Sequence, residues 1–464
     1  MKKLMYLALL AIITSMGCRK IEVDGGATNN NGNGNGTTEN TILEGRITAN
    51  RTLKADYVYK LRGLVYVTNG AVLTIEPGTK IVGEKGKNGG LIITRSCRII
   101  ADGTAAKPIV FTSEEANPQR GDWAGVVLLG NAPTNASFNG QQGVGEIEGG
   151  INNSDGLGLY GLGAGSNPAD NSGILRYVRI EYAGYAFLPD KEINGLTFGG
   201  VGNGTIIDYV QVSYANDDSF EWFGGTVNCS HLISYKTLDD DFDTDNGFSG
   251  KVQFGIAIRD SSIADISKSE AFESDNDANG SQLLPQTKAV FSNMTVIGPQ
   301  ATSSNVGNSL FLAAAQIRRN SSLSIFNSIF MGWPKGLLID ASKGYPTDNN
   351  FATGLNVQNT IIGGCATPVT YAASTTSPTG ATNASILNWF NTAGFGNTIL
   401  AANEDVKLVA PYNYSNPDLT PQPGSPALTG AAFSHSYLLD GFASVSYRGA
   451  VGSNDLWYKE WTKY

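Results

Sequence analysis

A repeat of 22 residues in the middle of the chain limits the folds that this sequence can adopt. The segment Asp217–Gly225 (DDSFEWFGG) aligns with Asp239–Gly247 (DDDFDTDNG), and Phe272–Asn276 (FESDN) repeats part of the pattern again. A period in the low twenties with short apolar runs is typical of stacked coils, in which each coil adds one layer to a shared core. The repeat therefore predicts a solenoid of β-strands.

A second repeat, of 32 residues, supports the same prediction. Ile174–Ala183 aligns with Ile206–Ala215 at every apolar position, and Ile325–Ile329 aligns with Val357–Ile361. The apolar runs are short and are separated by turns rich in Gly, Asn and Pro, as expected for strands rather than helices. Asn293, Asn327 and Asn359 occupy matched positions. We expect their amides to stack and to hydrogen-bond along the axis.

These patterns predict an all-β chain organised as one elongated domain. We expect a parallel β-helix over residues 41–430 and a C-terminal aromatic cap over residues 431–464, which contains Trp457 and Trp461. A solenoid end needs such a cover over its exposed strands. Residues 131–172 are too long for a corner and predict a surface loop. Residues 384–390 predict a short helix inside an insertion.

The first forty residues predict export. Lys2 and Lys3 precede an apolar run that is too short to span a bilayer, so residues 1–17 are interpreted as a signal peptide. Ser15–Cys18 (SMGC) resembles a bacterial lipobox, which implies lipidation of Cys18 and, because Arg19 follows, the outer membrane. The alternative is an ordinary secretory cleavage site. Residues 18–40 are rich in Asn and Gly and predict a polar tether.

Composition excludes several function classes. The formal net charge is −9 at pH 7, which disfavours nucleic acid as a partner. With two histidines and no CxxC spacing, the sequence offers no zinc site. Cys97, Cys229 and Cys365 are an odd number and give no disulfide framework. Cys229 and Cys365 lie in apolar segments and are expected to be buried free thiols.

The aligned acids are the candidate functional site. Carboxylates on adjacent coils lie about 4.8 Å apart and repel one another. Three outcomes are open: a bound cation, raised carboxyl pKa values, or side chains turned into water or bonded to backbone amides. Oxygen ligands without His or Cys favour Ca²⁺. The predicted metal ligands are Asp217, Asp218, Glu221, Asp239, Asp240, Asp241, Asp243, Asp245, Glu273 and Asp275.

Aromatic residues beside the acids suggest a ligand-binding surface. Trp222, Phe223, Tyr182 and Tyr214 are candidates for stacking on a sugar or a peptide, although each could equally be a core aromatic. A hydrolase would need two opposed carboxylates, which Asp217, Asp218, Asp240 and Asp243 could supply. A calcium-dependent lyase would need a base, and Lys236 and Lys251 are near in sequence. A structural shaft or adhesin is the third alternative.

Several motifs resemble a family of secreted β-helix proteins. They are Leu73–Ile81 (LTIEPGTKI), Pro108–Ser113 (PIVFTS), Gly121–Gly125 (GDWAG) and the acidic coils themselves. The resemblance implies a single-stranded right-handed parallel β-helix of the pectin-lyase-like type, common among surface lipoproteins of Bacteroidota. Such proteins often look as though they work beside TonB-dependent receptors, and they have no well-established activity.

We therefore expect an outer-membrane lipoprotein that faces the cell surface, with the periplasmic face as the alternative. Its expected role is that of a non-catalytic binding or assembly module in nutrient capture, with a polysaccharide or a peptide as ligand. The runner-up function is a polysaccharide lyase or glycoside hydrolase on the same fold.

Overall fold

The computed structural model describes residues 39–188, 191–300 and 307–464. The predicted signal peptide and Cys18 lie outside the described residues, as does nearly all of the predicted tether. The chain divides into two units, Met1–Asn40 and Thr41–Tyr464, and the second is described below. None of the helices in the described part of the chain combines the length and the apolar composition of a membrane-spanning segment.

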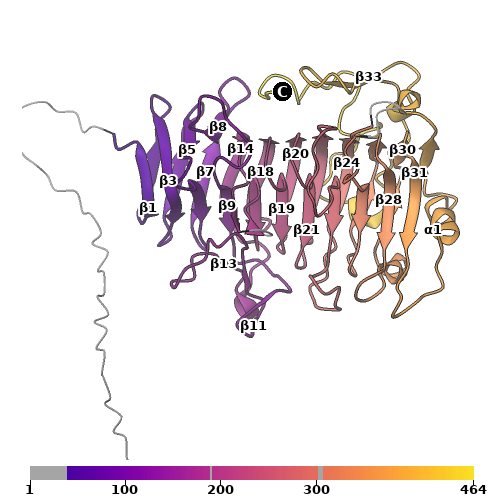
Figure 1. The fold of residues 1–464 in the computed structure, drawn as a ribbon, viewed down its shortest axis with the longest axis horizontal. Helices are drawn as coiled ribbons and strands as arrows, with labels where there is room; N and C mark the ends of the chain where they lie inside the picture. Colours follow the sequence, from indigo (N-terminus) through magenta and orange to yellow (C-terminus); the bar gives the residue numbers. More distant parts are fainter. Residues whose placement is uncertain (1–38, 189–190, 301–306) are drawn as a thin grey trace, which may run out of the picture. The chain divides into compact units, whose positions relative to one another are not determined.

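The unit Thr41–Tyr464 is a right-handed parallel β-helix whose strands form three columns along its axis, and its colours advance in sequence order from coil to coil (Figure 1). Five long strands each contribute to the first and second columns: β14 (Gly173–Glu181), β18 (Ile206–Ser213), β20 (Asn228–Tyr235), β22 (Lys251–Ile258) and β24 (Val290–Ile297). The two N-terminal strands β1 (Ile42–Ile47) and β3 (Val58–Val67) instead join the second column to the third.

Shorter strands complete the columns. The first column also contains β2 (Arg51–Leu53), β4 (Val72–Ile75), β7 (Arg98–Asp102), β26 (Ser324–Phe326) and β29 (Val357–Gln358). The second contains β5 (Lys80–Gly83), β8 (Ile109–Ser113), β27 (Ile329–Met331), β30 (Ile361–Gly363) and β32 (Thr398–Leu400). The third consists of β6 (Gly90–Ile93), β9 (Gly125–Leu129), β17 (Leu196–Gly199), β19 (Phe220–Phe223), β21 (Phe242–Asp245), β23 (Phe272–Ser274), β25 (Ala313–Ile317), β28 (Lys335–Asp340) and β31 (Thr367–Ala372).

The remaining elements are insertions and connections. Four antiparallel pairs are β10 (Ser137–Phe138) with β11 (Gln141–Gln142), β12 (Gly145–Glu146) with β13 (Leu159–Tyr160), β15 (Ala186–Leu188) with β16 (Lys191–Glu192), and β33 (Leu408–Ala410) with β34 (Asp418–Pro421). The predicted short helix is confirmed as α1 (Asn383–Phe390), which Thr382 caps. The 3₁₀ turns are η1 (Gly163–Gly165), η2 (Thr347–Ala352), η3 (Asn403–Val406), η4 (Pro426–Leu428) and η5 (Ser436–Leu438).

The strand register confirms both sequence repeats. Ile174 pairs with Ile206, so the 32-residue repeat is one coil stacked on the next. In the third column, Glu221 pairs with Asp243 and Asp243 pairs with Glu273. The acids that align in the sequence therefore occupy one position on three successive strands.

A left-handed residue in each long strand turns the chain from the first column to the second. The residues with positive φ at this position are Tyr177, Tyr209, His231, Phe254 and Asn293, and Asn327 and Asn359 follow on later coils. The predicted equivalence of the three asparagines is therefore confirmed. The predicted ladder of direct bonds between these amides is wrong, because Asn293 donates to the Tyr447 carbonyl at 3.0 Å and Asn327 to the Ala432 carbonyl at 3.2 Å. One bond does run along the axis, from Asn327 Nδ2 to Ser292 Oγ of the preceding coil at 3.1 Å.

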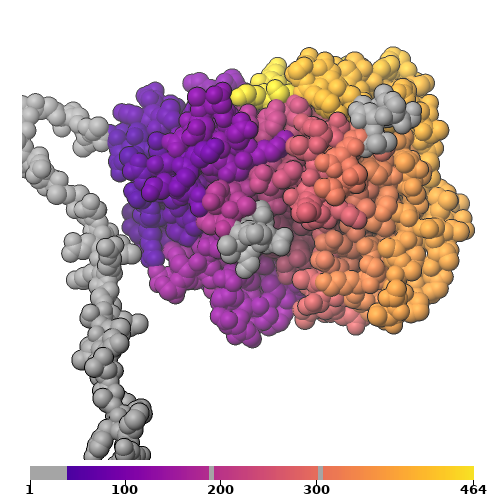
Figure 2. Space-filling view, viewed as in Figure 1, coloured from indigo at the N-terminus to yellow at the C-terminus, as the bar shows by residue number. Residues whose placement is uncertain are grey.

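The C-terminal segment (residues 431–464) corrects the predicted end cap. It runs back along the side of the solenoid toward the earlier coils, as Figures 1 and 2 show. Trp461 packs edge-on against Tyr177 and Tyr209, and Lys463 bonds to Gln211 in β18. The apolar outward face of the second column explains this path, because that long face needs more cover than the end of the helix.

Other apolar segments have their expected places. The insertion at residues 131–172 lies over the third column, where Ile147 and Tyr160 pack against Leu129 and Phe223. Cys229 and Cys365 are buried free thiols, as predicted, and Cys97 is a third. Burial raises the pKa of Cys365 to about 12, so this thiol is not a nucleophile near neutral pH.

Candidate functional site

The candidate site lies on the outward face of the third column. In β19, Phe220 and Trp222 point into the core, so the alternating geometry of a strand turns Glu221 outward. Asp243 and Glu273 occupy the same position on β21 and β23. At the carboxyl ends of β21 and β23, Asp245 and Asp275 add two more acids.

These acids line one cavity of about 600 Å³, named here the acidic cavity. Its lining brings together eleven carboxyl groups and two guanidinium groups from three sequence regions. The carboxyl groups belong to Glu148, Asp217, Asp218, Glu221, Asp239, Asp240, Asp243, Asp245, Asp265, Glu273 and Asp275, and the guanidinium groups belong to Arg318 and Arg319. Nine of the ten predicted metal ligands are therefore brought together.

Asp241 is the exception and corrects the prediction. Its side chain is fully buried and accepts a hydrogen bond from Ser234 at 2.5 Å. It also forms an ion pair of 3.2 Å with Arg259, whose side chain is equally buried. Asp239–Asp241 are consecutive, and the tight turn before β21 sends the third carboxyl inward while the first two face the cavity. Asp241 therefore has a structural role.

Three groups of acids are compact enough to hold a cation. They are Asp217, Asp218 and Asp239; Asp218, Glu221 and Asp243; and Asp240, Glu270 and Glu273. In each group, one carboxylate oxygen per residue lies within 4.8 Å of the others. Glu270 was not among the predicted ligands, although it precedes Phe272 as Asp240 precedes Phe242. It is 1% exposed and has a buried Oε2 atom without a hydrogen-bond partner.

Two of the acids also hold the turns of adjacent coils. The Asp240 backbone N–H donates to Asp218 Oδ1 at 2.8 Å, and the Glu270 N–H donates to Asp240 Oδ1 at 2.6 Å. The alternative in which aspartates fix turns by bonding backbone amides is therefore confirmed for these two residues. Each retains a second carboxylate oxygen for the cavity.

Burial dominates the electrostatics of the site. It raises the pKa of Asp239, Asp245 and Glu270 to about 7, with neighbouring carboxylates adding to the shift for each. Burial also raises the pKa of Glu221 well above its ordinary range, and nearby Glu148 and Asp243 raise it further. Ionising the whole set is therefore unfavourable without a compensating positive charge.

Two arginines at the end of the cavity were not predicted. Arg318 forms ion pairs with Glu273 and Asp275, and Arg319 forms one with Asp275. The lysines considered as bases lie elsewhere: Lys236 Nζ sits 5.1 Å from the ring centroid of Tyr235, and Lys251 donates to the Asp440 carbonyl. Neither lysine lines the acidic cavity, so neither is placed to act as the base that a calcium-dependent lyase would need there.

The four aromatic residues predicted to bind a ligand differ in where they lie. Trp222 is fully buried and stacks on Phe198 at 5.3 Å, so its predicted ligand role is wrong. Phe223 lines the acidic cavity. Tyr182 and Tyr214 stack on each other at 5.1 Å, and neither lines this cavity.

Comparison with known proteins places this architecture in a family. Residues 45–403 match the family described as pectate-lyase-like β-helix domain, which is most of the chain. The chain belongs to this family. Among curated proteins, no match to this pectate-lyase-like β-helix protein was found. Family membership establishes the fold, whereas function depends on the residues grafted onto it.

The acidic cavity of this pectate-lyase-like protein has the ligand chemistry of a hard-cation site. Ca²⁺ takes six to eight oxygen ligands and tolerates irregular geometry. The three groups of acids supply only carboxylate oxygens, without sulfur or imidazole. Glu148 comes from the insertion, so no repeat-based signal could have identified it. Glu270 precedes Phe272 by two residues, as Asp240 precedes Phe242, so the repeat carried a signal for Glu270 that the prediction missed.

Proposed function

We propose that this protein is a non-catalytic binding module whose acidic cavity holds Ca²⁺ and, through it, a ligand. The observation that carries the proposal is the Asp240, Glu270 and Glu273 group, where a nearly fully buried Glu270 oxygen has no partner. An orphaned carboxylate oxygen among other carboxylates lacks a positive partner, and a cation supplies one.

The repulsion between the carboxylates of the acidic cavity favours a bound cation over an empty cavity. Carboxylates about 4.8 Å apart repel by about 3 kcal/mol at an effective dielectric constant of 20. Arg318 and Arg319 offset this repulsion only at one end, where they pair with Glu273 and Asp275. Within the described structure, Asp218, Glu221 and Asp243 form a group, and none of the three makes an ion pair with a cationic side chain. A divalent cation there would lower the pKa of all three.

The cation would leave coordination positions for the oxygen atoms of a glycan or a peptide. The cavity of about 600 Å³ has room for more than an ion, and Phe223 adds an apolar wall. A cavity of this chemistry favours binding over a purely structural shaft.

We further propose the cellular location expected from the sequence. The protein would be an outer-membrane lipoprotein, lipidated at Cys18, that captures nutrients beside a TonB-dependent receptor. Co-purification of a receptor from detergent-solubilised outer membranes tests that partnership.

Calorimetric titration with Ca²⁺ tests the binding module. We expect heat of binding for the unaltered protein and a rise in the thermal midpoint. Asp243→Asn and Glu270→Gln should each weaken binding by at least tenfold because each removes a ligand oxygen charge. The matched control is Asp440→Asn, which removes one negative charge from a side chain that is 97% exposed and outside the cavity. Absence of both heat and stabilisation would refute the proposal.

A glycoside hydrolase is the second candidate. Burial raises the pKa of Asp243 to about 6 and that of Glu221 well above its ordinary range, which suits a protonated general acid beside an ionised base. A lyase is less favoured because both arginines already serve in ion pairs. Release of reducing ends from a polysaccharide panel, measured with Ca²⁺ and with EDTA, separates these functions. Turnover that Glu221→Gln abolishes would replace the binding proposal with the hydrolase.

A further inference from the structure

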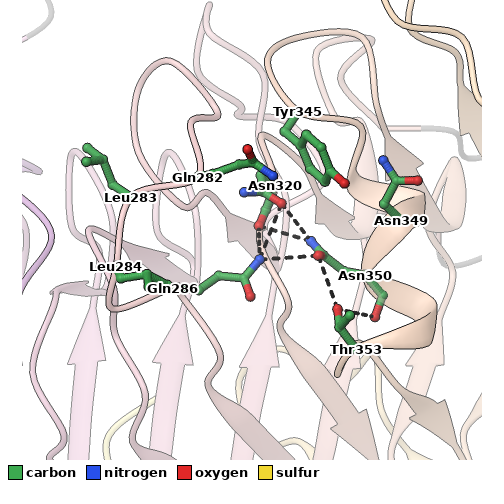
Figure 3. A pocket seen from close by; sticks show the side chains of 9 residues that line it. All are labelled: Gln282, Leu283, Leu284, Gln286, Asn320, Tyr345, Asn349, Asn350 and Thr353. Carbon is green, nitrogen blue, oxygen red and sulfur yellow. Dashed lines mark hydrogen bonds between the residues drawn. The ribbon is translucent and has the colours of Figure 1, made fainter.

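A second hollow lies at the carboxyl ends of the third-column strands β23, β25 and β28, beyond the acidic cavity (Figure 3). It has a volume of about 310 Å³ and is lined by the turns that follow these strands. We infer that this hollow is a binding site for an uncharged oligosaccharide. The inference goes beyond the proposed function, because it needs neither the cation nor the acids.

The lining is uncharged, in a chain whose neighbouring cavity is crowded with carboxylates. The nine described lining residues are Gln282, Leu283, Leu284, Gln286, Asn320, Tyr345, Asn349, Asn350 and Thr353. Five of them carry a primary amide, a group that donates and accepts hydrogen bonds at once. That dual capacity matches the hydroxyl groups of a sugar, whereas an ion would find no opposite charge here.

The floor of the hollow is preorganised. Gln286 Nε2 donates to the Asn320 carbonyl at 2.8 Å, and Asn350 Nδ2 donates to the same carbonyl at 3.0 Å. Asn320 Nδ2 in turn donates to the Ser281 carbonyl at 2.6 Å. Figure 3 shows this network joining Asn320, Asn350 and Gln286. A fixed floor reduces the conformational entropy lost when a ligand binds.

The rim carries polar and aromatic side chains that are not engaged in hydrogen bonds or ring stacking within the described structure. In the described structure, the side chains of Gln282 and Asn349 make no hydrogen bond within the protein, and the ring of Tyr345, a residue that is 39% exposed, stacks on no other ring. In Figure 3, Tyr345 and Asn349 stand on the side of the hollow away from the β-strands. An exposed aromatic face beside free amides suits the apolar C–H face and the hydroxyl edge of a pyranose.

An adjoining hollow extends the surface. It has a volume of about 490 Å³ and shares Gln282, Tyr345 and Asn349 with the first. Its other described lining residues are Asn279, Gly280, Ser281, Gly344, Pro346, Ser377 and Thr379, again without charge. Tyr345 thus borders two hollows, each within the size range of small-molecule sites. This arrangement offers consecutive subsites for at least two sugar units.

Peptide is the less suitable occupant. Extended peptides bind by adding a strand to an open sheet edge. The rim residues Gln282, Tyr345 and Asn349 instead belong to turns and to η2, which present side chains rather than a strand edge.

Titration calorimetry in EDTA tests the inference, with cellotetraose, xylotetraose, mannotetraose and galactotetraose as uncharged probes and tetragalacturonate as the charged comparison. We expect at least one uncharged tetrasaccharide to bind and to outcompete tetragalacturonate for this site. Tyr345→Ala should weaken that binding about tenfold, the loss typical of one aromatic contact. Asn349→Ala supplies a second, independent test of the rim.

The controls separate this site from the acidic cavity. Tyr57→Ala removes a tyrosine of nearly equal exposure, 40%, that is remote in sequence, and should leave binding unchanged. Glu270→Gln should also leave it unchanged while reducing Ca²⁺ binding, so the two proposals fail separately. The inference is overturned if no uncharged tetrasaccharide binds, if binding survives both rim substitutions, or if an uncharged Gly/Ser/Asn peptide alone binds in a Tyr345-dependent way.

Discussion

Individual carboxyl groups in this protein differ in their neighbours more than in their chemistry. Glu270 lies among other acids, whereas Asp241 lies against Arg259. Burial raises the pKa of both, to about 7 for Glu270 and to about 6 for Asp241. The first is available to a cation, and the second already has its cationic partner.

The raised pKa values predict a stability that falls with pH in the absence of metal. Asp239, Asp245 and Glu270 have a pKa of about 7 in the folded protein, against about 4 when unfolded. The folded state therefore binds more protons between these values, and its free energy of unfolding should decrease as pH rises from about 4 to about 7. Each such group contributes a slope of up to about 1.4 kcal/mol per pH unit.

Urea unfolding in EDTA across this pH range measures the slope. Glu270→Gln should make the slope shallower because it removes one titrating group. Saturating Ca²⁺ should abolish most of the fall, because a bound cation keeps the carboxylates ionised and adds about 2.7 kcal/mol at a hundred times its Kd. A stability that is flat or that increases over this range would contradict the expected protonation.

The buried ion pair of Asp241 predicts a different phenotype. Asp241→Ala leaves Arg259 charged and buried, although the Asp239 and Leu238 carbonyls still accept from it. We expect the free energy of unfolding to fall by about 3–5 kcal/mol. Ca²⁺ affinity, measured by calorimetry on the folded fraction, should stay unchanged. Loss of Ca²⁺ binding at unaltered stability would restore Asp241 to the metal ligands.

At the scale of elements, the three columns have distinct outward faces. The second column presents an apolar outward face, including Ile233 and Ile256, which the C-terminal segment covers. The third column presents Glu221 and Asp243 outward, and these line the acidic cavity. The same backbone geometry thus yields a packing face in one column and a binding face in the other.

The path of the C-terminal segment predicts that its tryptophan stabilises the side of the solenoid. Trp461 is 1% exposed and contacts residues of β14 and β18. Trp461→Ala should lower the free energy of unfolding by about 3–5 kcal/mol. The matched control is Leu456→Ala, at a side chain that is 54% exposed, which should change it by less than about 0.5 kcal/mol. Equal effects of the two substitutions in urea unfolding would contradict this packing role.

For the whole molecule, the proposed lipid anchor predicts where the protein is found. Cys18→Ser removes the acylation site, so the protein should move from the membrane fraction to a soluble fraction. A single acyl chain binds membranes only marginally, and a fully lipidated cysteine is needed for stable anchoring. Cell fractionation with mass spectrometry of the mature N-terminus provides the measurement. Cys97→Ser is the control, and retention of Cys18→Ser in the membrane would refute the anchor.

Much of the fold could be predicted because periodicity is a local property. Strand alternation and the repeat lengths place Ile174 over Ile206 and Glu221 over Asp243 without knowledge of the tertiary structure. The same alternation indicates that Trp222, which is next to the outward-facing Glu221, faces the core. The prediction that Trp222 contacts a ligand could therefore have been rejected from the sequence alone. The C-terminal segment was not predictable in this way, because its aromatic residues pack on a face that no repeat of its own specifies.

The candidate site was predictable only where it follows the repeat. The direction of Asp241 depends on a tight turn and on the partner Arg259, which is distant enough in sequence to give no signal. Glu148 and Arg318 reach the acidic cavity from an insertion and from a later coil, which the repeat does not cover. Glu270 groups with Asp240 and Glu273 and occupies the repeat position of Asp240, so the alignment could have indicated it.

The amino-acid order by itself determined the coiled all-β architecture and the stacking of the acids, because hydrophobic alternation and coil length act through the nearest backbone neighbours. Tertiary structure alone decided which carboxyl groups share a cavity, which one is neutralised by an arginine, and where the uncharged hollow forms. The physical reason is that burial and charge pairing depend on side chains brought together from different coils, and their mutual approach is set only when the whole solenoid has packed.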